Sequence, residues 1–216
     1  LTRMAESIDA GILCSPYETA RIAENKGLTA KALQHATYGP RVYDLVEDID
    51  RYPVFLKPLI GAGSRDTFLV RSREELLSIL EAKPTLLISE YLPGREYTVS
   101  CFTNREGKIL FAGASTRDRI LNGRAYHIQR AEKREEFQYI AEDLNRRFVF
   151  RGSWFFQVKE DEAGQLKLME FSVRPIGEMA LYRQLGVNFA ALTVQDAMGR
   201  DIKILFNDLE LAMDLR

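Results

Sequence analysis

The chain has 216 residues, of which 46% are apolar and 28% charged, and its formal net charge is −1. This composition excludes an intrinsically disordered protein and allows a sizeable core, in one large domain or two small ones. A net charge near zero argues against nucleic acid or an anionic membrane as partner, so an anionic ligand would need a local cluster of cations. Cys14 and Cys101 lie in unrelated segments, and no signal peptide or long apolar run is found, so we expect a soluble, cytoplasmic protein.

Helices are predicted at the start of the chain. Ser15-Pro16-Tyr17-Glu18 has the pattern of a capping box, with Ser15 as N-cap, and predicts a helix that ends near Asn25. A second helix is expected to follow, through Gln34. Residues 52–57 are rich in β-forming residues and run directly into the glycines of residues 61–64, which predicts a strand followed by a glycine loop.

The middle of the chain alternates between short strands and one helix. A return strand is expected at residues 68–70, and a second capping box at residues 72–75 opens an amphipathic helix that ends near Lys83. Three further strands are then predicted, at residues 85–89, 96–103 and 108–114.

The C-terminal half is predicted to contain two helices around a hairpin. The helices cover residues 131–145 and 189–198, and the strands of the hairpin cover residues 154–159 and 166–172. Helices and hairpins occur in separate groups along the chain and do not alternate strictly. We therefore expect an α+β fold with mainly antiparallel sheets.

The hairpin at residues 154–172 carries the strongest pattern of polar side chains. Alternation places Glu170, Ser172 and Arg174 on one face, and a four-residue loop would put Gln157 directly opposite Glu170. Carboxylate and amide oxygens suit magnesium, which shares its other positions with water and phosphates, while Arg174 would hold a transferring phosphoryl group. The alternative is a solvent-facing strand with one ion pair, and the flanking apolar residues favour a site.

Lys57 and the glycine loop form a second pattern. A lysine on a strand, followed by a loop whose N–H groups can fold over phosphates, is one way to bind a triphosphate. No Gly-Lys-Ser/Thr closes the loop, so it is not a Walker A sequence. Taken alone, this pattern favours a simple hairpin turn.

Two more segments are candidates for ligand binding. Residues 89–96 would offer backbone groups to an adenine edge and the Glu96 carboxylate to ribose hydroxyls, although a polar turn is the alternative. A basic stretch follows, formed by Arg117, Arg119, Arg124 and Arg130. A solvated loop is the default interpretation of such a run.

In chain order these motifs resemble the ATP-grasp superfamily, in particular its carbamoyl-phosphate-synthase-like and carboxylate-amine-ligase-like members. The resemblance spans residues 15–199 and includes Glu24-Asn25-Lys26-Gly27-Leu28-Thr29, which is similar to the family's DK-x-LT. It implies two α+β lobes that clamp ATP with magnesium or manganese. The implied domains are residues 1–40, a remnant of a preceding domain with the leading helices, residues 41–91, the small lobe, and residues 92–216, the large lobe.

The resemblance also implies residue roles. Nucleotide binding falls to Lys26, Lys57, Gly61, Gly63, Ser64, Glu90, Leu92 and Glu96. Metal binding falls to Gln157, Glu170 and Ser172. Catalytic roles fall to Lys57, Arg119 and Arg174. The implied activity is that of an ATP-dependent ligase, which activates a small carboxylate as an acyl phosphate for attack by an amine.

Two departures from the family leave alternatives open. Ser172-Val173 stands where the family has Asn-Pro, and a hydroxyl is a poorer magnesium ligand than an amide oxygen. An ATP-binding regulatory or degenerate module without ligase activity is therefore the competing hypothesis, and an unrelated α+β domain is a third. The sequence begins with Leu1 and lacks the N-terminal domain usual in these ligases, so residues 1–14 are expected to be its last part. The oligomeric state stays open, with a homodimer as one hypothesis.

Overall fold

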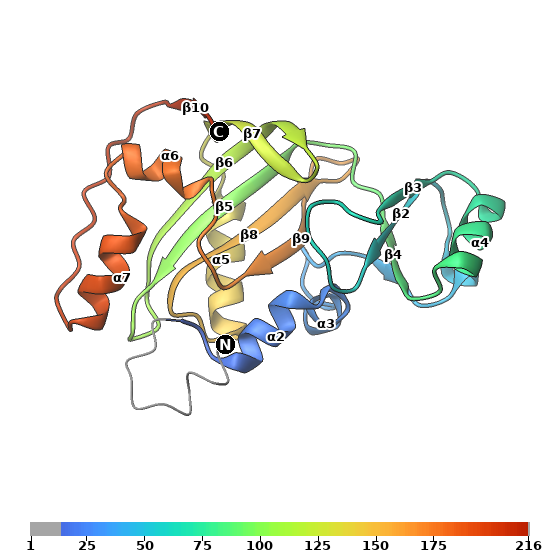
Figure 1. Cartoon of the computed structure of the whole chain (residues 1–216), viewed down its shortest axis with the longest axis horizontal. Helices are drawn as coiled ribbons and strands as arrows, with labels where there is room; N and C mark the ends of the chain where they lie inside the picture. Colours follow the sequence, from blue (N-terminus) through green and yellow to red (C-terminus); the bar gives the residue numbers. More distant parts are fainter. Residues whose placement is uncertain (1–13, 216) are drawn as a thin grey trace.

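The computed structural model describes residues 14–215, and the expected remnant of a preceding domain at residues 1–13 lies outside them. Two separate sheets organise the fold, one of four strands and one of six, with helices packed against both (Figure 1). Every strand pairing in both sheets is antiparallel. The α+β class with antiparallel sheets, predicted from the grouping of helices and hairpins, is therefore confirmed.

The small sheet turns one face toward a helix and the other toward the large lobe. Its elements are β1 (Val42–Tyr43), η1 (Val46–Asp48), β2 (Val54–Pro58), β3 (Phe68–Val70), α4 (Arg73–Ala82) and β4 (Leu86–Glu90), with the strand order β1-β4-β2-β3. Val54 and Leu56 are fully buried and pack with Leu76 of α4. Because side chains alternate along a strand, Phe55 and Lys57 point to the opposite face.

The large sheet carries the main core. Its strands are β5 (Glu96–Thr103), β6 (Ile109–Leu121), β7 (Arg124–Arg130), β8 (Gly152–Glu160), β9 (Leu166–Ser172) and β10 (Ala212–Asp214), in the order β10-β7-β6-β5-β8-β9. Helix α5 (Glu135–Arg147) covers one face, where Ile140 packs in the same core as Trp154. The Trp154 ring is fully buried and stacks on Phe150 with 3.8 Å between ring centroids.

The opposite face of the large sheet is only partly covered. Helices α6 (Met179–Gln184) and α7 (Phe189–Ala197) pack over one end, where Phe102 and Phe111 are buried against them. Figure 1 shows these helices at the end of the large sheet that is farthest from the small lobe. The other end of this face, which begins with Glu96, is left to face the small lobe.

The β8–β9 hairpin has the predicted pairing of Gln157 with Glu170, but its turn differs from the predicted one. Its turn has five residues, 161–165, because Glu160 pairs with Leu166. That length alone would shift the register by one residue, but Met169 bulges out of the ladder and Gln157 lies opposite Glu170. The predicted pairing of Gln157 with Glu170 is therefore confirmed.

The N-terminal helices begin differently from the prediction. Helix α2 (Tyr17–Glu24) has Pro16 as its N-cap and no side-chain capping bond, because Ser15 Oγ accepts from the Arg151 N–H at 3.1 Å. The predicted capping box at Ser15 is wrong. The box at residues 72–75 holds in part, since Ser72 Oγ accepts from the Glu75 N–H at 3.3 Å.

Five elements were not predicted, namely β1, η1, β7, β10 and α6. Strand β6 also runs seven residues beyond residue 114, to Leu121. The basic stretch from Arg117 to Arg130 is consequently a hairpin, and the default interpretation as a loop is corrected.

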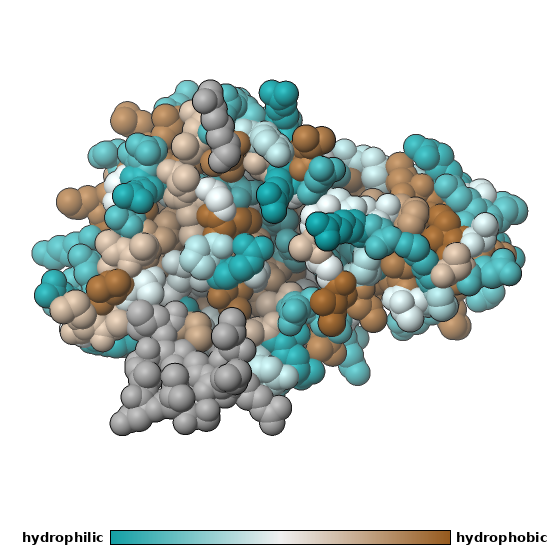
Figure 2. All heavy atoms as spheres, viewed as in Figure 1, coloured by the Kyte–Doolittle hydropathy of each residue, from teal (hydrophilic) through white to brown (hydrophobic). Residues whose placement is uncertain are grey.

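Figure 2 shows hydrophilic side chains over much of the surface of both lobes, with apolar residues scattered among them. Within residues 14–215, the structure contains no helix with the length and apolar composition needed to cross a membrane.

Candidate functional site

A cleft lies between the two sheets and encloses about 1040 Å³, including open solvent at its mouth. This is within the range of sites that bind nucleotide-sized ligands. The lining comes from both sheets, the glycine loop and the segment that connects the lobes. Ten of the predicted site residues line it: Lys26, Lys57, Gly61, Gly63, Ser64, Glu90, Leu92, Glu96, Gln157 and Glu170.

Lys26 is positioned by the first turn of a short helix. Asn25 caps α3 (Lys26–Ala32), with its side-chain oxygen accepting from the N–H groups of Gly27 and Leu28. The Lys26 ammonium donates to the carbonyl oxygen of Gly61 at 2.9 Å and lies 3.7 Å from Glu170 Oε2. One lysine therefore connects the glycine loop to the carboxylate of the large sheet.

Lys57 brings a second cation to the same place. Burial and then the charge of Lys26 lower the pKa of its ammonium to about 8, while Glu170 and Glu90 oppose the shift. Two lysines held this close without enough negative charge between them create a local positive potential. Such a potential suits a polyanion in a protein whose net charge is near zero.

The segment between the lobes is held at the edge of the cleft. Glu90 exchanges two hydrogen bonds with Arg41, because its N–H donates to the Arg41 carbonyl at 3.0 Å and its carboxylate accepts from the Arg41 N–H at 2.9 Å. Ser89 Oγ donates to the Phe55 carbonyl at 3.1 Å. Tyr91 and Leu92, which follow, line the cleft.

Arg117 is the centre of a buried polar network on the large sheet. Its Nη1 contacts Glu96 Oε1, its Nη2 donates to the Gly123 carbonyl at 2.7 Å, and its Nε lies 3.4 Å from Glu178 Oε1. The side chains of Arg117 and Glu178 are each 5% exposed. Burial lowers the pKa of the Arg117 guanidinium, whereas Glu178 and then Glu170 raise it.

The network continues to Gln157 and fixes how its amide is oriented. Thr98 Oγ1 donates to Glu178 Oε1 at 3.1 Å and accepts from Gln157 Nε2 at 3.3 Å. A hydroxyl has a single proton to donate, so the Gln157 nitrogen must be the donor to Thr98. The amide oxygen of Gln157 is then left for another partner, beside Glu170.

Gln157 and Glu170 suit one magnesium ion that takes only a few of its ligands from the protein. Among the described residues, no three His, Cys, Asp or Glu side chains come together at a potential metal site. Glu170 offers a carboxylate, but Glu96 is already bound to Arg117. Magnesium is often held by one or two carboxylates and completes its shell with phosphates and water, so this donor set is sufficient.

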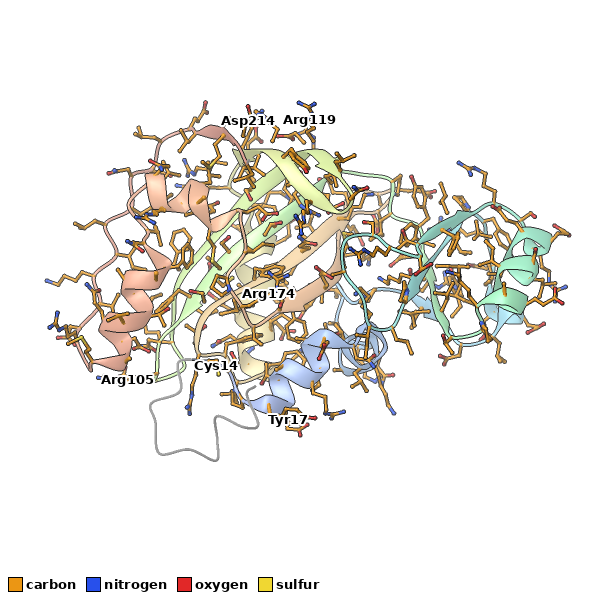
Figure 3. The ribbon with its side chains drawn as sticks, viewed as in Figure 1. Cys14, Tyr17, Arg105, Arg119, Arg174 and Asp214 are labelled. Carbon is orange, nitrogen blue, oxygen red and sulfur yellow. The ribbon has the colours of Figure 1, made fainter. Side chains whose placement is uncertain are left out.

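Three predicted site residues lie outside the cleft: Arg119, Ser172 and Arg174. Asp118 is an extra residue in the β6–β7 ladder, so it shifts Arg119 to the face opposite Arg117, where Arg119 is exposed in the same row as His127 and Asp214 (Figure 3). Arg117 thus occupies the position that was expected of Arg119.

The other two residues extend the row that contains Glu170. Ser172 lies opposite Phe155, at the end of β9. Arg174 follows the strand and is exposed, with Cζ 5.1 Å from the centre of the Phe155 ring and Nη1 donating to the Pro175 carbonyl at 3.1 Å (Figure 3).

The interpretation of the sequence missed Arg117, Glu178 and Lys159 as site residues. Arg117 was noticed only as part of a basic stretch. Its alternation with Ser115 on a strand next to Glu96 would have been the usable pattern. Glu178 reaches the network through a turn after β9, and no spacing rule predicts that.

The tip of the β6–β7 hairpin rests on the glycine loop. A Cβ atom on Gly123 would lie 2.8 Å from the Gly63 backbone and 2.8 Å from Ser64 Oγ. Gly123 also has a φ of +71°, a conformation that other residues adopt only with strain. Only glycine therefore allows this approach of the large lobe to the loop.

Gly123→Ala is expected to lower the free energy of unfolding by about 1 kcal/mol or more. Gly107→Ala is the matched control, because Gly107 has a φ of +81° and nothing within 4 Å of an added Cβ. It shares the backbone strain but not the clash, so it should cost less. Equal losses of stability in the two variants, measured by urea denaturation, would contradict a role of this contact.

Residues 82–212 match the model of a family described as "ATP-grasp in the biosynthetic pathway with Ter operon". The chain is also 30% identical over 95 residues to a D-alanine–D-alanine ligase of Fusobacterium nucleatum, a match that covers 42% of the chain and 30% of the ligase.

Solved structures share the fold at low sequence identity. The biotin carboxylase domain of the 2-oxoglutarate carboxylase of Hydrogenobacter thermophilus, in complex with MgADP, ADP and bicarbonate, has a TM-score of 0.80 at 17% identity, covering 95% of this chain and 53% of that chain. N5-carboxyaminoimidazole synthetase of Staphylococcus aureus, complexed with ADP, has a TM-score of 0.79 at 15% identity, covering 99% and 61%. An L-amino acid ligase of Bacillus licheniformis has a TM-score of 0.67 at 20% identity, covering 91% and 52%. The chain thus spans roughly half the length of these structures.

Proposed function

Because the chain belongs to the ATP-grasp family, whose members are ATP-dependent carboxylate ligases, we propose that it binds ATP with magnesium in the cleft and activates a small carboxylate for attack by an amine. In this proposal residues 41–91 form the small lobe and residues 92–216 the large lobe, after the leading residues 1–40. The carboxylate and the amine are small molecules.

The convergence of Lys26, Lys57 and Glu170 carries the proposal. These residues come from a helix, from the small sheet and from the large sheet, yet they line one cleft, and the ammonium of Lys26 is 3.7 Å from the Glu170 carboxylate. Two cations and one carboxylate are the complement of a triphosphate with a bound divalent cation.

Each residue has a defined task in the proposed reaction. The γ-phosphoryl group passes from ATP to a carboxylate oxygen of the substrate, ADP leaves, and the amine then displaces phosphate from the acyl phosphate. Lys26 and Lys57 neutralise charge on the phosphates, and the glycine loop offers N–H groups to them. Glu170 and Gln157 would hold magnesium, which supplies charge neutralisation between the phosphates. The Glu96 carboxylate accepts hydrogen bonds from the ribose hydroxyls and keeps its contact with Arg117.

Two of the proposed site residues, Ser172 and Arg174, lie outside the lining of the cleft. Ser172 and Arg174 continue the row of Glu170 along β9 and beyond it, so we place them at the end of the site where the carboxylate substrate would bind. Arg117, which lines the cleft, replaces Arg119 as the buried cation of the large sheet.

The activity is tested by release of ADP in the presence of amino acids and other small carboxylates, each combined with a panel of amines. Release that depends on both a carboxylate and an amine supports the ligase. A search by mass spectrometry for the amide product identifies the pair.

Glu170→Gln is expected to lower kcat for ADP release by about 100-fold, because it removes the carboxylate that would hold magnesium. Raising the magnesium concentration should recover part of the loss. Glu81→Gln, at an exposed position on α4, is the control and should behave as the parent protein. A Glu170→Gln protein with unchanged kcat and magnesium dependence would refute the assignment.

An ATP-binding module without ligase activity is the second candidate. It is favoured by the donor set, in which Gln157 supplies a neutral amide and only Glu170 supplies a charge, while Ser172 lies outside the lining of the cleft. Binding of Mg-ATP without any ADP release stimulated by substrate would favour this module over the ligase. Failure to bind Mg-ATP at all would contradict both.

A further inference from the structure

Lys159 is a cleft residue that the proposed reaction does not use. It lies on β8, two residues after Gln157 and on the same face, and it pairs across the sheet with Glu96 of β5. Its side chain lines the cleft. The nearest aromatic ring is that of Tyr91, whose centre lies 6.0 Å from Lys159 Nζ.

The Lys159 ammonium has no hydrogen bond or ion pair with another of residues 14–215. Lys26 and Arg117, two other cations that line the cleft, each have a carboxylate partner. The Lys159 side chain is half-buried in the cleft, so its charge is partly removed from water without a partner. Leaving such a group unpaired costs free energy, so an acceptor supplied by a ligand would relieve it.

The position of Tyr91 shows which end of the cleft Lys159 faces. Lys57 pairs with Leu87 across the small sheet, and Tyr91 follows four residues later in the same segment. At the rise of a β-strand, Tyr91 is about 13 Å farther along the sheet than the lysine of the phosphate end. Lys159 therefore lies at the end of the cleft away from Lys57 and the glycine loop, between Tyr91 and Glu96.

We propose that Lys159 donates a charge-assisted hydrogen bond to an acceptor atom of the nucleoside part of the bound nucleotide. The inference rests on the proposed function, because it assumes that the phosphates lie at the Lys57 end. Lys159 then contributes to the choice of a nucleotide over free polyphosphate, and it does not touch the atoms that react. It is a binding residue, not a catalytic one.

Titration calorimetry with two ligands tests the proposal. Lys159→Met keeps the length of the stem and removes the charge, so it should weaken ADP binding by about tenfold, the effect of one charged hydrogen bond. Binding of tripolyphosphate, which lacks the nucleoside, should change less than twofold. Lys57→Met should weaken both ligands, and Lys159→Arg should restore most of the ADP affinity.

A thermal melt of the ligand-free protein separates binding from structure. If Lys159 serves only to support the fold, Lys159→Met lowers the Tm, whereas removal of an unpaired, half-buried charge leaves the Tm unchanged or raises it. Unchanged ADP affinity, or equal losses for ADP and tripolyphosphate, would overturn the inference while the proposed function stands. A parent protein that binds neither ligand overturns both.

Discussion

Lys57→Met is expected to weaken ATP binding by about 10- to 100-fold, since each charged hydrogen bond to a phosphate contributes about 1.5–3 kcal/mol. The rate of ADP release should fall by about 100-fold or more, because the same cation stabilises charge that develops during transfer. Methionine fills the volume of the stem, so the loss reports the charge. Calorimetry with ATP and a steady-state assay of ADP release measure the two effects.

The effect should also depend on pH. The pKa of Lys57 is lowered to about 8 by burial and by Lys26, so the free protein loses this positive charge as the pH rises through 8. Binding of ATP must then restore the proton, and affinity should decline by up to about tenfold per pH unit above that value. The Lys57→Met protein should lack this decline.

An exposed lysine near the start of the chain gives the control. Lys31 lies exposed on α3, the helix that also carries Lys26, and Lys31→Met should bind and turn over as the parent protein does. Full ATP affinity and turnover in Lys57→Met would remove the basis of the nucleotide site.

Arg117→Leu is expected to lower the free energy of unfolding by about 3–5 kcal/mol, the range found when one partner of a buried ion pair is removed. The change leaves the Glu178 carboxylate, itself 4% exposed, without a cation, and it also frees Glu96. Urea denaturation followed by far-UV circular dichroism measures the loss.

A second substitution shows whether the unpaired charge is the cause. Adding Glu178→Gln to Arg117→Leu should recover part of the stability, because the amide can still accept from Thr98 Oγ1 and carries no charge. Arg124→Leu, at an exposed position of the same hairpin, should cost little. A loss below about 1 kcal/mol in Arg117→Leu would show that the network is hydrated and unimportant for stability.

Local patterns were enough to predict most of the elements. Strands β3 and β5 were predicted with the ends they have in the structure, and Ser72 caps its helix. The prediction at Ser15 failed because its hydroxyl is used by the N–H of Arg151, 136 residues away. A partner that distant leaves no trace in the local sequence.

The candidate site was predicted best where neighbouring strands carry it. Gln157 and Glu170 follow from the register of one hairpin, and Lys57 from the alternation of one strand. Arg119 was taken from the resemblance to the family, and the choice failed because a single extra residue, Asp118, reverses which arginine points inward. Lys159 was overlooked because its place in the cleft is defined by Tyr91, a residue far away in the sequence that comes close to Lys159 only in the folded protein.

Because Met169 bulges out of the ladder, the length of the β8–β9 turn does not by itself decide where the Glu170 carboxylate lies. A four-residue turn with a regular ladder and a five-residue turn with one bulged residue both bring Glu170 opposite Gln157. A chain with one residue more or fewer at positions 161–165 can therefore keep Glu170 opposite Gln157. It does so if the bulge in β9 is gained or lost together with that residue.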